Sequence, residues 1–432
     1  MSKCILCLFI IFIFLSRQTS AQQKVFTQDI DNFWTAYDSI RIADDSLKQI
    51  HFIQSLYIDK GTQGLKAFMA ARDYSAQLYI RLIKKYPKFW NSIRPNTLTV
   101  KSKIGEIEKS IGKLKTLYPE LKNAKMYFTI GGLRSGGTTR DSMVLIGAEI
   151  GTGDSTTDAS EFPSKWLAGV FKEHNSDNLV SLNVHEYIHT QQNGESSNLL
   201  AQAIKEGACD FIAELVIGKP LQRNYITYGK NHEQELKETF KQEMFTTMFN
   251  KWLYNGSNAK TVADLGYFMG YAICKSYYGN APNKKQAIKA IIELNYSDTT
   301  AIETFFKKSN YYKEPINKEQ LEQAIKAKQP VLIKTEPLLN DNTLVDTSVK
   351  QVTFVFSQSM GEGVSINYGD KGKELYPITG IIGFFDNKTK FSVNVDLKPN
   401  HEYEFIITNA SFVSAEGYPL LKDYPIKFKT KP

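Results

Sequence analysis

The stretch VSLNVHEYIHTQQN, residues 180–193, carries two of the chain's six histidines, four positions apart. In an α-helix this spacing puts His185 and His189 on one face, about one turn apart, so both imidazoles can reach one metal ion. Glu186 follows the first histidine directly, where a base for a metal-bound water is needed. Such a short pattern also arises by chance, so its meaning depends on the rest of the chain.

Two liganding histidines need a third protein ligand, and a catalytic zinc site then keeps a fourth position for water. The segment SNLLAQAIKEGACDFIAELVIGK, residues 197–219, predicts a second helix, on which Glu206 lies 17 residues after the second histidine. Glu195 and Glu214 are rival ligands. Asp210 lies one turn after Glu206, where a carboxylate is expected to accept the other ring proton of a liganding histidine.

These residues resemble those of the gluzincins, the zinc metallopeptidases of the thermolysin and aminopeptidase clan. The segments YFTIGGLRSGGTTRDSMVLIGAEIG, HEYIHTQQ, KEGACDFIAEL and DLGYFMGYAICKSYY together look like predicted secreted zinc proteases of Bacteroidetes-type bacteria. The sequence departs from many gluzincins at Lys205, where they carry an asparagine before the liganding glutamate. That departure weakens any transfer of thermolysin's substrate preferences.

The resemblance implies an exported zinc peptidase that acts on a peptide or protein substrate, with one Zn²⁺ per chain. His185, His189 and Glu206 would hold the metal, and Glu186 would act as general base on its bound water. Within this enzyme class, an aminopeptidase is the alternative to an endopeptidase. The competing class is a non-catalytic envelope or secreted binding protein, in which the metal is structural or absent.

Further candidate residues surround this motif in the sequence. Tyr267 and Tyr271 lie one turn apart on a predicted helix and could stabilise an oxyanion, with core packing as the alternative role. Gly136 and Gly137 lie in the turn of a predicted β-hairpin formed by KMYFTIG and DSMVLIGAEI, whose edge would pair with extended substrate. In the aminopeptidases of this clan a glutamate on that strand holds the substrate's free amine, and Glu149 is the candidate here.

The first residues predict a secretory signal peptide at 1–21, because Lys3 precedes an apolar run from Ile5 to Leu15 that is too short to span a bilayer. Cys4 and Cys7 lie before and inside this run rather than after it. We therefore expect an exported protein, periplasmic or secreted, without a lipid anchor. No later segment has transmembrane length.

The composition argues against other classes of function. The net charge is +8, but the lysines are scattered among acidic residues, so a nucleic-acid-binding surface is not expected. Beyond the signal peptide, Cys209 and Cys274 are the only cysteines, which excludes a disulfide framework. We expect two buried thiols, with Cys209 facing away from the metal.

A chain of 432 residues predicts more than one domain. Residues 22–330 show mostly helical periodicity and form the expected metallopeptidase region, an α+β fold of the zincin type. Residues 336–432 read as short alternating strands and resemble a bacterial Ig-like β-sandwich. We expect this domain to contact glycan or another envelope protein.

Overall fold

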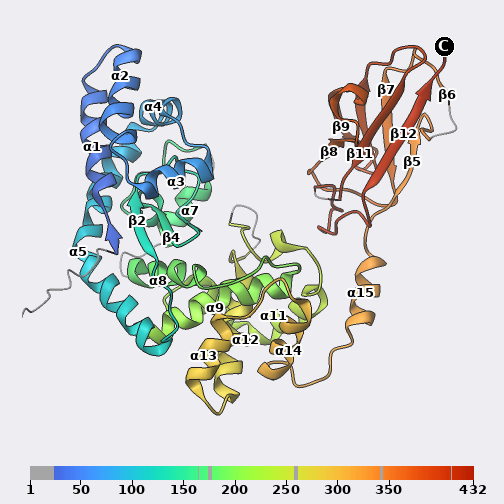
Figure 1. Cartoon of the computed structure of the whole chain (residues 1–432). Coiled ribbons are helices and arrows are strands. Elements are labelled where there is room, and N and C mark those ends of the chain that lie inside the picture. The colour runs from blue at the N-terminus through green and yellow to red at the C-terminus, as the bar shows by residue number, and fades with distance from the viewer. Residues whose placement is uncertain (1–23, 164, 174–177, 257–260, 341–343, 410) are drawn as a thin grey trace, which may run out of the picture.

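The computed structural model describes residues 24–432 except 164, 174–177, 257–260, 341–343 and 410. Figure 1 shows a mainly helical region (residues 25–326) followed by a C-terminal β-region (residues 332–430). This division into a helical part and an all-β part confirms the coarse fold prediction. The predicted signal peptide lies outside the described residues. Within the described part of the chain, no helix has the length and apolar character needed to cross a membrane.

The first part of the helical region packs helices around an aromatic core that includes Phe33, Tyr57 and Trp90, all fully buried. Two of the helices start at hydroxyl caps, where Thr62 and Ser75 accept backbone N–H groups three residues ahead. These elements are α1 (Gln28–Arg41), α2 (Ser46–Phe52), the π-helix η1 (Ile53–Ile58), α3 (Gln63–Arg72), α4 (Ala76–Lys85) and α5 (Pro87–Leu117).

A four-stranded sheet follows in the order β1-β2-β4-β3, formed by β1 (Val25–Phe26), β2 (Lys125–Thr129), β4 (Met143–Gly147) and β3 (Gly137–Arg140). Strands β2 and β4 run parallel, whereas β3 pairs antiparallel with β4. The predicted hairpin between the segments of β2 and β4 is therefore wrong. The physical reason is that the second half of its expected turn forms β3, which leaves β3 as an edge strand.

The rest of the helical region is built around α8 (Leu179–His189), α9 (Leu199–Ile217) and α12 (Leu265–Asn280). Helices α9 and α12 cross closely because glycines meet at the crossing. A Cβ added at Gly270 would lie 1.7 Å from the carbonyl oxygen of Ala203, and one at Gly207 would lie 2.0 Å from the backbone nitrogen of Tyr271. The surrounding helices are α6 (Ala148–Gly151), α7 (Lys165–Glu173), α10 (Asn224–Asn231), α11 (Glu233–Glu243), α13 (Lys284–Ile292), α14 (Thr299–Ser309) and α15 (Lys318–Lys326).

The C-terminal β-region consists of two four-stranded sheets, ordered β5-β7-β10-β9 and β6-β12-β11-β8. Its own apolar core includes Phe354, Phe391 and Phe405. The strands are β5 (Leu332–Glu336), β6 (Leu344–Val345), β7 (Gln351–Phe356), β8 (Ile366–Tyr368), β9 (Ile378–Phe385), β10 (Lys390–Val395), β11 (Glu402–Ile407) and β12 (Tyr424–Thr430). Its first strand begins at Leu332, four residues before the boundary expected from the sequence.

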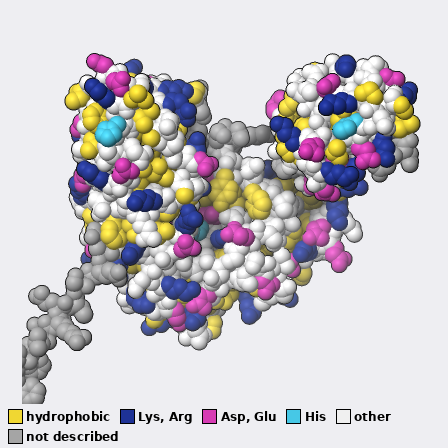
Figure 2. All heavy atoms as spheres, turned by 45° about the horizontal axis from the view of Figure 1, so that its top comes forward, with side chains coloured by type: hydrophobic (Ala, Val, Ile, Leu, Met, Phe, Trp, Pro, Cys, Tyr) yellow, Lys and Arg dark blue, Asp and Glu magenta, His cyan; other side chains and the backbone are white. Residues whose placement is uncertain are grey.

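The surface carries charges of both signs. On the face shown in Figure 2, basic and acidic side chains are interspersed over both regions. Surface lysines of the described residues pair with neighbouring acids, as Lys429 does with Glu402 at 2.8 Å. The expectation that nucleic acid is not a partner stays a prediction.

Candidate metal centre

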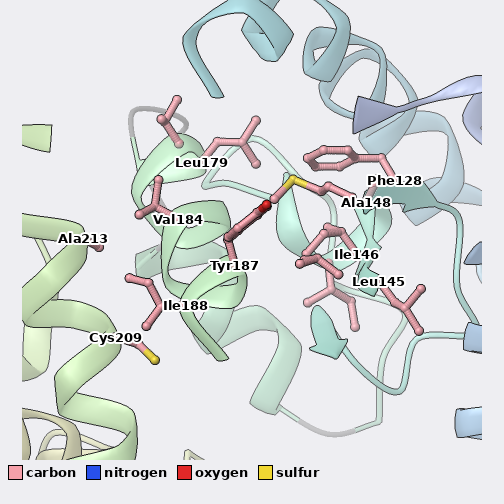
Figure 3. Packing of buried hydrophobic residues seen from close by; sticks show 14 of the residues in the cluster. Phe128, Leu145, Ile146, Ala148, Leu179, Val184, Tyr187, Ile188, Cys209 and Ala213 are labelled. Carbon is pink, nitrogen blue, oxygen red and sulfur yellow. The ribbon is translucent and has the colours of Figure 1, made fainter. Parts of the chain in front are cut away.

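Helix α8 carries the two histidines between the sheet and α9. Figure 3 shows Tyr187 on the side that faces Phe128 and Ile146, and Ile188 on the side of α9. The Tyr187 hydroxyl accepts the backbone N–H of Ala124 at 2.8 Å, which fixes α8 to the segment before β2. Because α8 is held on both sides, the face with His185 and His189 has a defined position.

Helix α9 brings the carboxylates to this face. It begins at Asn198, whose side chain accepts the N–H of Ala201, and ends at Gly218 with a left-handed φ of 79°. Glu206 and Asp210 lie one turn apart on it, and both are buried. Local capping and the tight crossing with α12 therefore set the position of both acids.

Three donor atoms converge at the centre. The Nε2 atoms of His185 and His189 lie 3.1 Å apart, and Oε2 of Glu206 lies 3.5 Å and 3.2 Å from them, respectively. In a tetrahedral zinc site with bonds of about 2.0 to 2.1 Å, the ligand atoms lie about 3.3 Å from one another. The residues present therefore fit a zinc ion.

In each of the three side chains, the polar atom that does not face the centre has a hydrogen-bond partner. The Nδ1 atom of His185 lies 2.7 Å from Oδ1 of Asp210, and that of His189 lies 2.7 Å from Oε1 of Gln192. The second carboxylate oxygen of Glu206 accepts hydrogen bonds from the Tyr254 hydroxyl at 2.7 Å and from Gln202 at 3.0 Å. Such partners fix the ring nitrogen that faces a metal and are typical of metal sites.

Asp210 lies in a charged network of its own. Its other oxygen accepts the Tyr225 hydroxyl at 2.7 Å, and Arg223 lies 3.5 Å from the oxygen that faces His185. Burial disfavours the charged carboxylate, but the positive charges of Arg223 and His185 outweigh this effect and lower the pKa of Asp210. Asp210 is thereby kept ionised beside the histidine, as expected for a carboxylate that orients a ligand.

The electrostatics of the cluster favour positive charge at its centre. Burial alone would lower the pKa of His185, but the carboxylates of Asp210 and Glu206 raise it to about 9. Burial opposes ionisation of Glu206 as well, yet the two histidines bring its pKa well below the ordinary value. A metal cation bound here would therefore compete with protons for the same nitrogens.

Cys209 does not face away from the centre, which corrects the sequence prediction. Its sulfur lies 3.4 Å from Nδ1 of His189, and the three groups His185, His189 and Cys209 are close enough to form an alternative metal-binding set. The thiol, however, faces the ring nitrogen opposite to the one that faces Glu206, and burial raises its pKa well above the ordinary value. Of the two groups, Glu206 is therefore the better-placed candidate for a third ligand. Cys209 and Cys274 are both buried and unpaired, as expected.

The rival glutamates lie elsewhere. The side chain of Glu195 is 99% exposed and its nearest charged partner is Lys205 at 3.7 Å. Glu214 accepts the hydroxyl of Tyr271 at 2.7 Å and the backbone N–H of Leu221 at 3.2 Å. Neither glutamate is available to the two histidines, which again favours Glu206.

Only one of the two candidate tyrosines lies at the centre. The ring of Tyr267 stacks against that of His185, with centroids 6.1 Å apart, and it lines the adjoining cleft. The hydroxyl of Tyr271 is instead held by Glu214, away from the histidines. Two residues one turn apart on α12 thus have different surroundings, because the helix crosses α9 between them.

Glu149 also lies away from an amine-binding position. It belongs to α6 rather than to a strand, and it is fully buried. Its two oxygens accept the backbone N–H groups of Gly131 and Leu133 at 2.7 and 3.2 Å, and burial raises its pKa to about 7. These contacts give Glu149 a structural role in holding the loop that leads to β3.

A two-part cleft adjoins the centre. Its polar part, of about 490 Å³, is lined by the histidines, Glu186 and Thr138, and its less polar part, of about 500 Å³, by Gly136, Gly137 and neighbouring apolar side chains. Strand β3 forms one wall. A Cβ added at Gly137 would lie 3.1 Å from the carboxylate of Glu186, so a larger residue here would press on that side chain.

The comparisons with known proteins give a family. The family model described as Gliding motility protein GldB, a lipoprotein family, matches residues 17–262, which is more than half of the chain. The chain belongs to the GldB family. No curated protein matches the chain. The solved structure of CopC from Methylosinus trichosporium OB3b is 19% identical over 24% of this chain and 95% of that chain, and its TM-score of 0.19 is too low to support an argument about fold.

Membership of the GldB family corrects the functional predictions. The family is one of gliding motility proteins and not of zinc metallopeptidases, so the identification as a gluzincin is wrong. The predictions of an exported hydrolase, of an aminopeptidase and of Glu186 as the base of a peptidase reaction are overturned with it. The finding favours the alternative class, a non-catalytic envelope protein.

The predicted localisation is corrected by the same finding. We expected no lipid anchor, because neither N-terminal cysteine follows the apolar run. The GldB family is a family of lipoproteins, which contradicts that expectation. The cysteine position was therefore an insufficient criterion, and the residues concerned lie outside the described part of the chain.

Several residues of the centre were missed from the sequence. Gln202 lies four positions before Glu206 on α9, and this helical spacing was an available signal. Gln192 lies three positions after His189, just beyond the end of α8. Tyr225 and Arg223 follow α9 closely, but nothing in their pattern indicates Asp210 as partner. Tyr254 comes from a loop 48 residues after Glu206, and only the tertiary fold brings it there.

Proposed function

We propose that this protein is a lipid-anchored envelope component of the gliding machinery that binds a partner protein without catalysis, and that one Zn²⁺ ion, held by His185, His189 and Glu206, stabilises the binding site. The family match supports the envelope and motility part of this proposal. In this proposal, only the arrangement of the three ligands on two helices resembles that of a zincin.

The observation that supports the metal ion is the position of three donor atoms, from His185, His189 and Glu206, within 3.1 to 3.5 Å of one another. Each of these side chains also has a hydrogen-bonded partner on its other polar atom. A buried cluster of two histidines and two carboxylates is costly unless its charges are paired or bind a cation. Because the chain supplies three ligands, a water or a partner's side chain would complete the coordination.

The cleft beside the metal centre supports a polypeptide partner. Strand β3 is the edge of its sheet, and within the described residues no strand pairs with its outer side. An extended segment of a partner can add to such an edge through backbone hydrogen bonds, while the less polar part of the cleft receives its side chains. The C-terminal β-region, proposed as Ig-like, is a second contact surface for glycan or another envelope protein.

The proposal is tested by allelic replacement in the bacterium that carries this chain, with colony spreading as the readout of gliding. His189→Ala removes a metal ligand, so we expect it to abolish spreading of colonies while the protein still reaches the envelope. Glu186→Gln keeps the shape of the cleft and removes only a carboxylate charge, so we expect normal spreading. Glu195→Gln, at an exposed position, is the matched control. A strain that spreads normally with His189→Ala, or not at all with Glu186→Gln, would contradict the proposal.

A further inference from the structure

Tyr254 holds the outer oxygen of Glu206. Its hydroxyl donates to Oε1 at 2.7 Å and accepts the amide of Gln202 at 2.7 Å, although the residue as a whole is 59% exposed. The other oxygen, Oε2, faces the histidines. The orientation of the carboxylate toward a metal therefore depends on a side chain that comes from the surface.

The backbone at Tyr254 is held in an unfavourable conformation. Its φ of 58° is left-handed, which is costly for a bulky aromatic residue and persists only where neighbouring contacts enforce it. On one side, the buried indole N–H of Trp252 donates to Glu243 at 2.7 Å. On the other, Asn255 donates to the carbonyl of Lys251 at 2.8 Å. The position of Tyr254 thus depends on the loop of residues 248–255.

The C-terminal β-region contacts this loop. The ammonium group of Lys251 lies 4.3 Å from the ring centroid of Tyr418 and 2.9 Å from Glu243. Met248, from the start of the loop, forms a small buried cluster with Tyr418 and with Ile325 of α15. Tyr418 therefore packs on two residues of the loop at once.

We propose that Tyr254 is a positioning residue of the metal centre and that the docked C-terminal β-region keeps it in place through the contact of Tyr418 with Lys251 and Met248. This inference rests on the proposed metal site. Lys251 lies three positions before Tyr254, so release of Tyr418 removes a support from the loop with the left-handed backbone. A partner that draws the C-terminal β-region away would then lower the affinity of the centre for its metal.

The test is titration of the full chain with Co²⁺, whose visible absorption reports on the ligands. Tyr254→Phe removes only the hydroxyl, and we expect it to weaken Co²⁺ binding by about 10-fold, as loss of a partner of a metal ligand does. Tyr418→Ala should weaken binding in the same direction. The double variant should bind no more weakly than Tyr254→Phe, because both changes act through one contact. Tyr368→Ala, at a half-exposed position on β8, is the control and should leave the affinity unchanged.

Independent effects that multiply in the double variant would overturn the inference, and so would wild-type affinity in Tyr418→Ala. Wild-type protein that binds no Co²⁺ would instead overturn the proposed metal site itself, and the inference with it. Lys251→Met keeps Tyr418 and serves if Tyr418→Ala does not fold. Hydrogen exchange at residues 248–255 gives a readout without metal, and unchanged exchange in Lys251→Met would also contradict the coupling.

Discussion

The crossing of α9 and α12 gives the sharpest stability prediction. Gly270→Ala adds a Cβ that would lie 1.7 Å from the carbonyl oxygen of Ala203, a backbone atom that cannot rotate away. The two helices must separate by about 1 Å or more. Overpacking of this kind typically lowers the free energy of unfolding by about 1 to 3 kcal/mol. The gain in helix propensity from Gly to Ala, about 1 kcal/mol, offsets only part of it. Because the clash is with a backbone atom, we expect a cost at the upper end of that range and a net loss of about 2 kcal/mol.

Gly112→Ala in α5 is the matched control, because nothing lies within 4 Å of an added Cβ there. That change should stabilise the protein by roughly 0.5 to 1 kcal/mol. Urea unfolding followed by the signal of the helical region measures both free energies of unfolding. Gly270→Ala should therefore lower the urea concentration at the unfolding midpoint, and Gly112→Ala should raise it. Equal midpoints for Gly270→Ala and wild type would refute the argument that this crossing requires glycine.

Two further predictions concern buried acids. Burial raises the pKa of Glu149 to about 7 from an ordinary value of 4.5, so the folded state retains a proton that the unfolded chain releases. Stability should consequently fall by about 3 kcal/mol as the pH rises from 4.5 to 7, and Glu149→Gln should lose this dependence; parallel pH profiles of the two proteins would contradict it. Asp210→Asn removes the charge behind His185 and should weaken metal binding about 10- to 100-fold. A metal titration with wild-type affinity would show that Asp210 does not orient the ligand.

Part of the centre followed from the sequence alone. Periodicity put His185 and His189 on one face of a helix, and a second helix after a short loop brought Glu206 and Asp210 back to them. These relations depend on local spacing, which a sequence displays directly. The conclusion drawn from them was nevertheless wrong, because a set of converging ligands does not determine what a protein does with its metal.

The features that could not be predicted depend on distant contacts. The GTTR sequence of β3 has no apolar alternation, so its sequence predicts a turn. In the structure, pairing with β4 stabilises it as a strand. Cys209 was expected to point away, but α9 is rotated so that its sulfur contacts His189. Tyr254 and Tyr418 meet their partners only through contacts between residues far apart in the sequence. Tertiary packing, rather than local propensity, decides each of these cases.

The most direct test of the account is the zinc content of the full chain, purified in detergent and measured by mass spectrometry. Wild-type protein and Glu186→Gln should each contain one zinc per chain, because Glu186 is not a ligand. Glu206→Ala leaves two protein ligands, too few for a stable site, and should contain none. Wild-type protein without zinc after dialysis against the metal, or Glu206→Ala with a full complement of zinc, would contradict the assignment of His185, His189 and Glu206 as the metal centre.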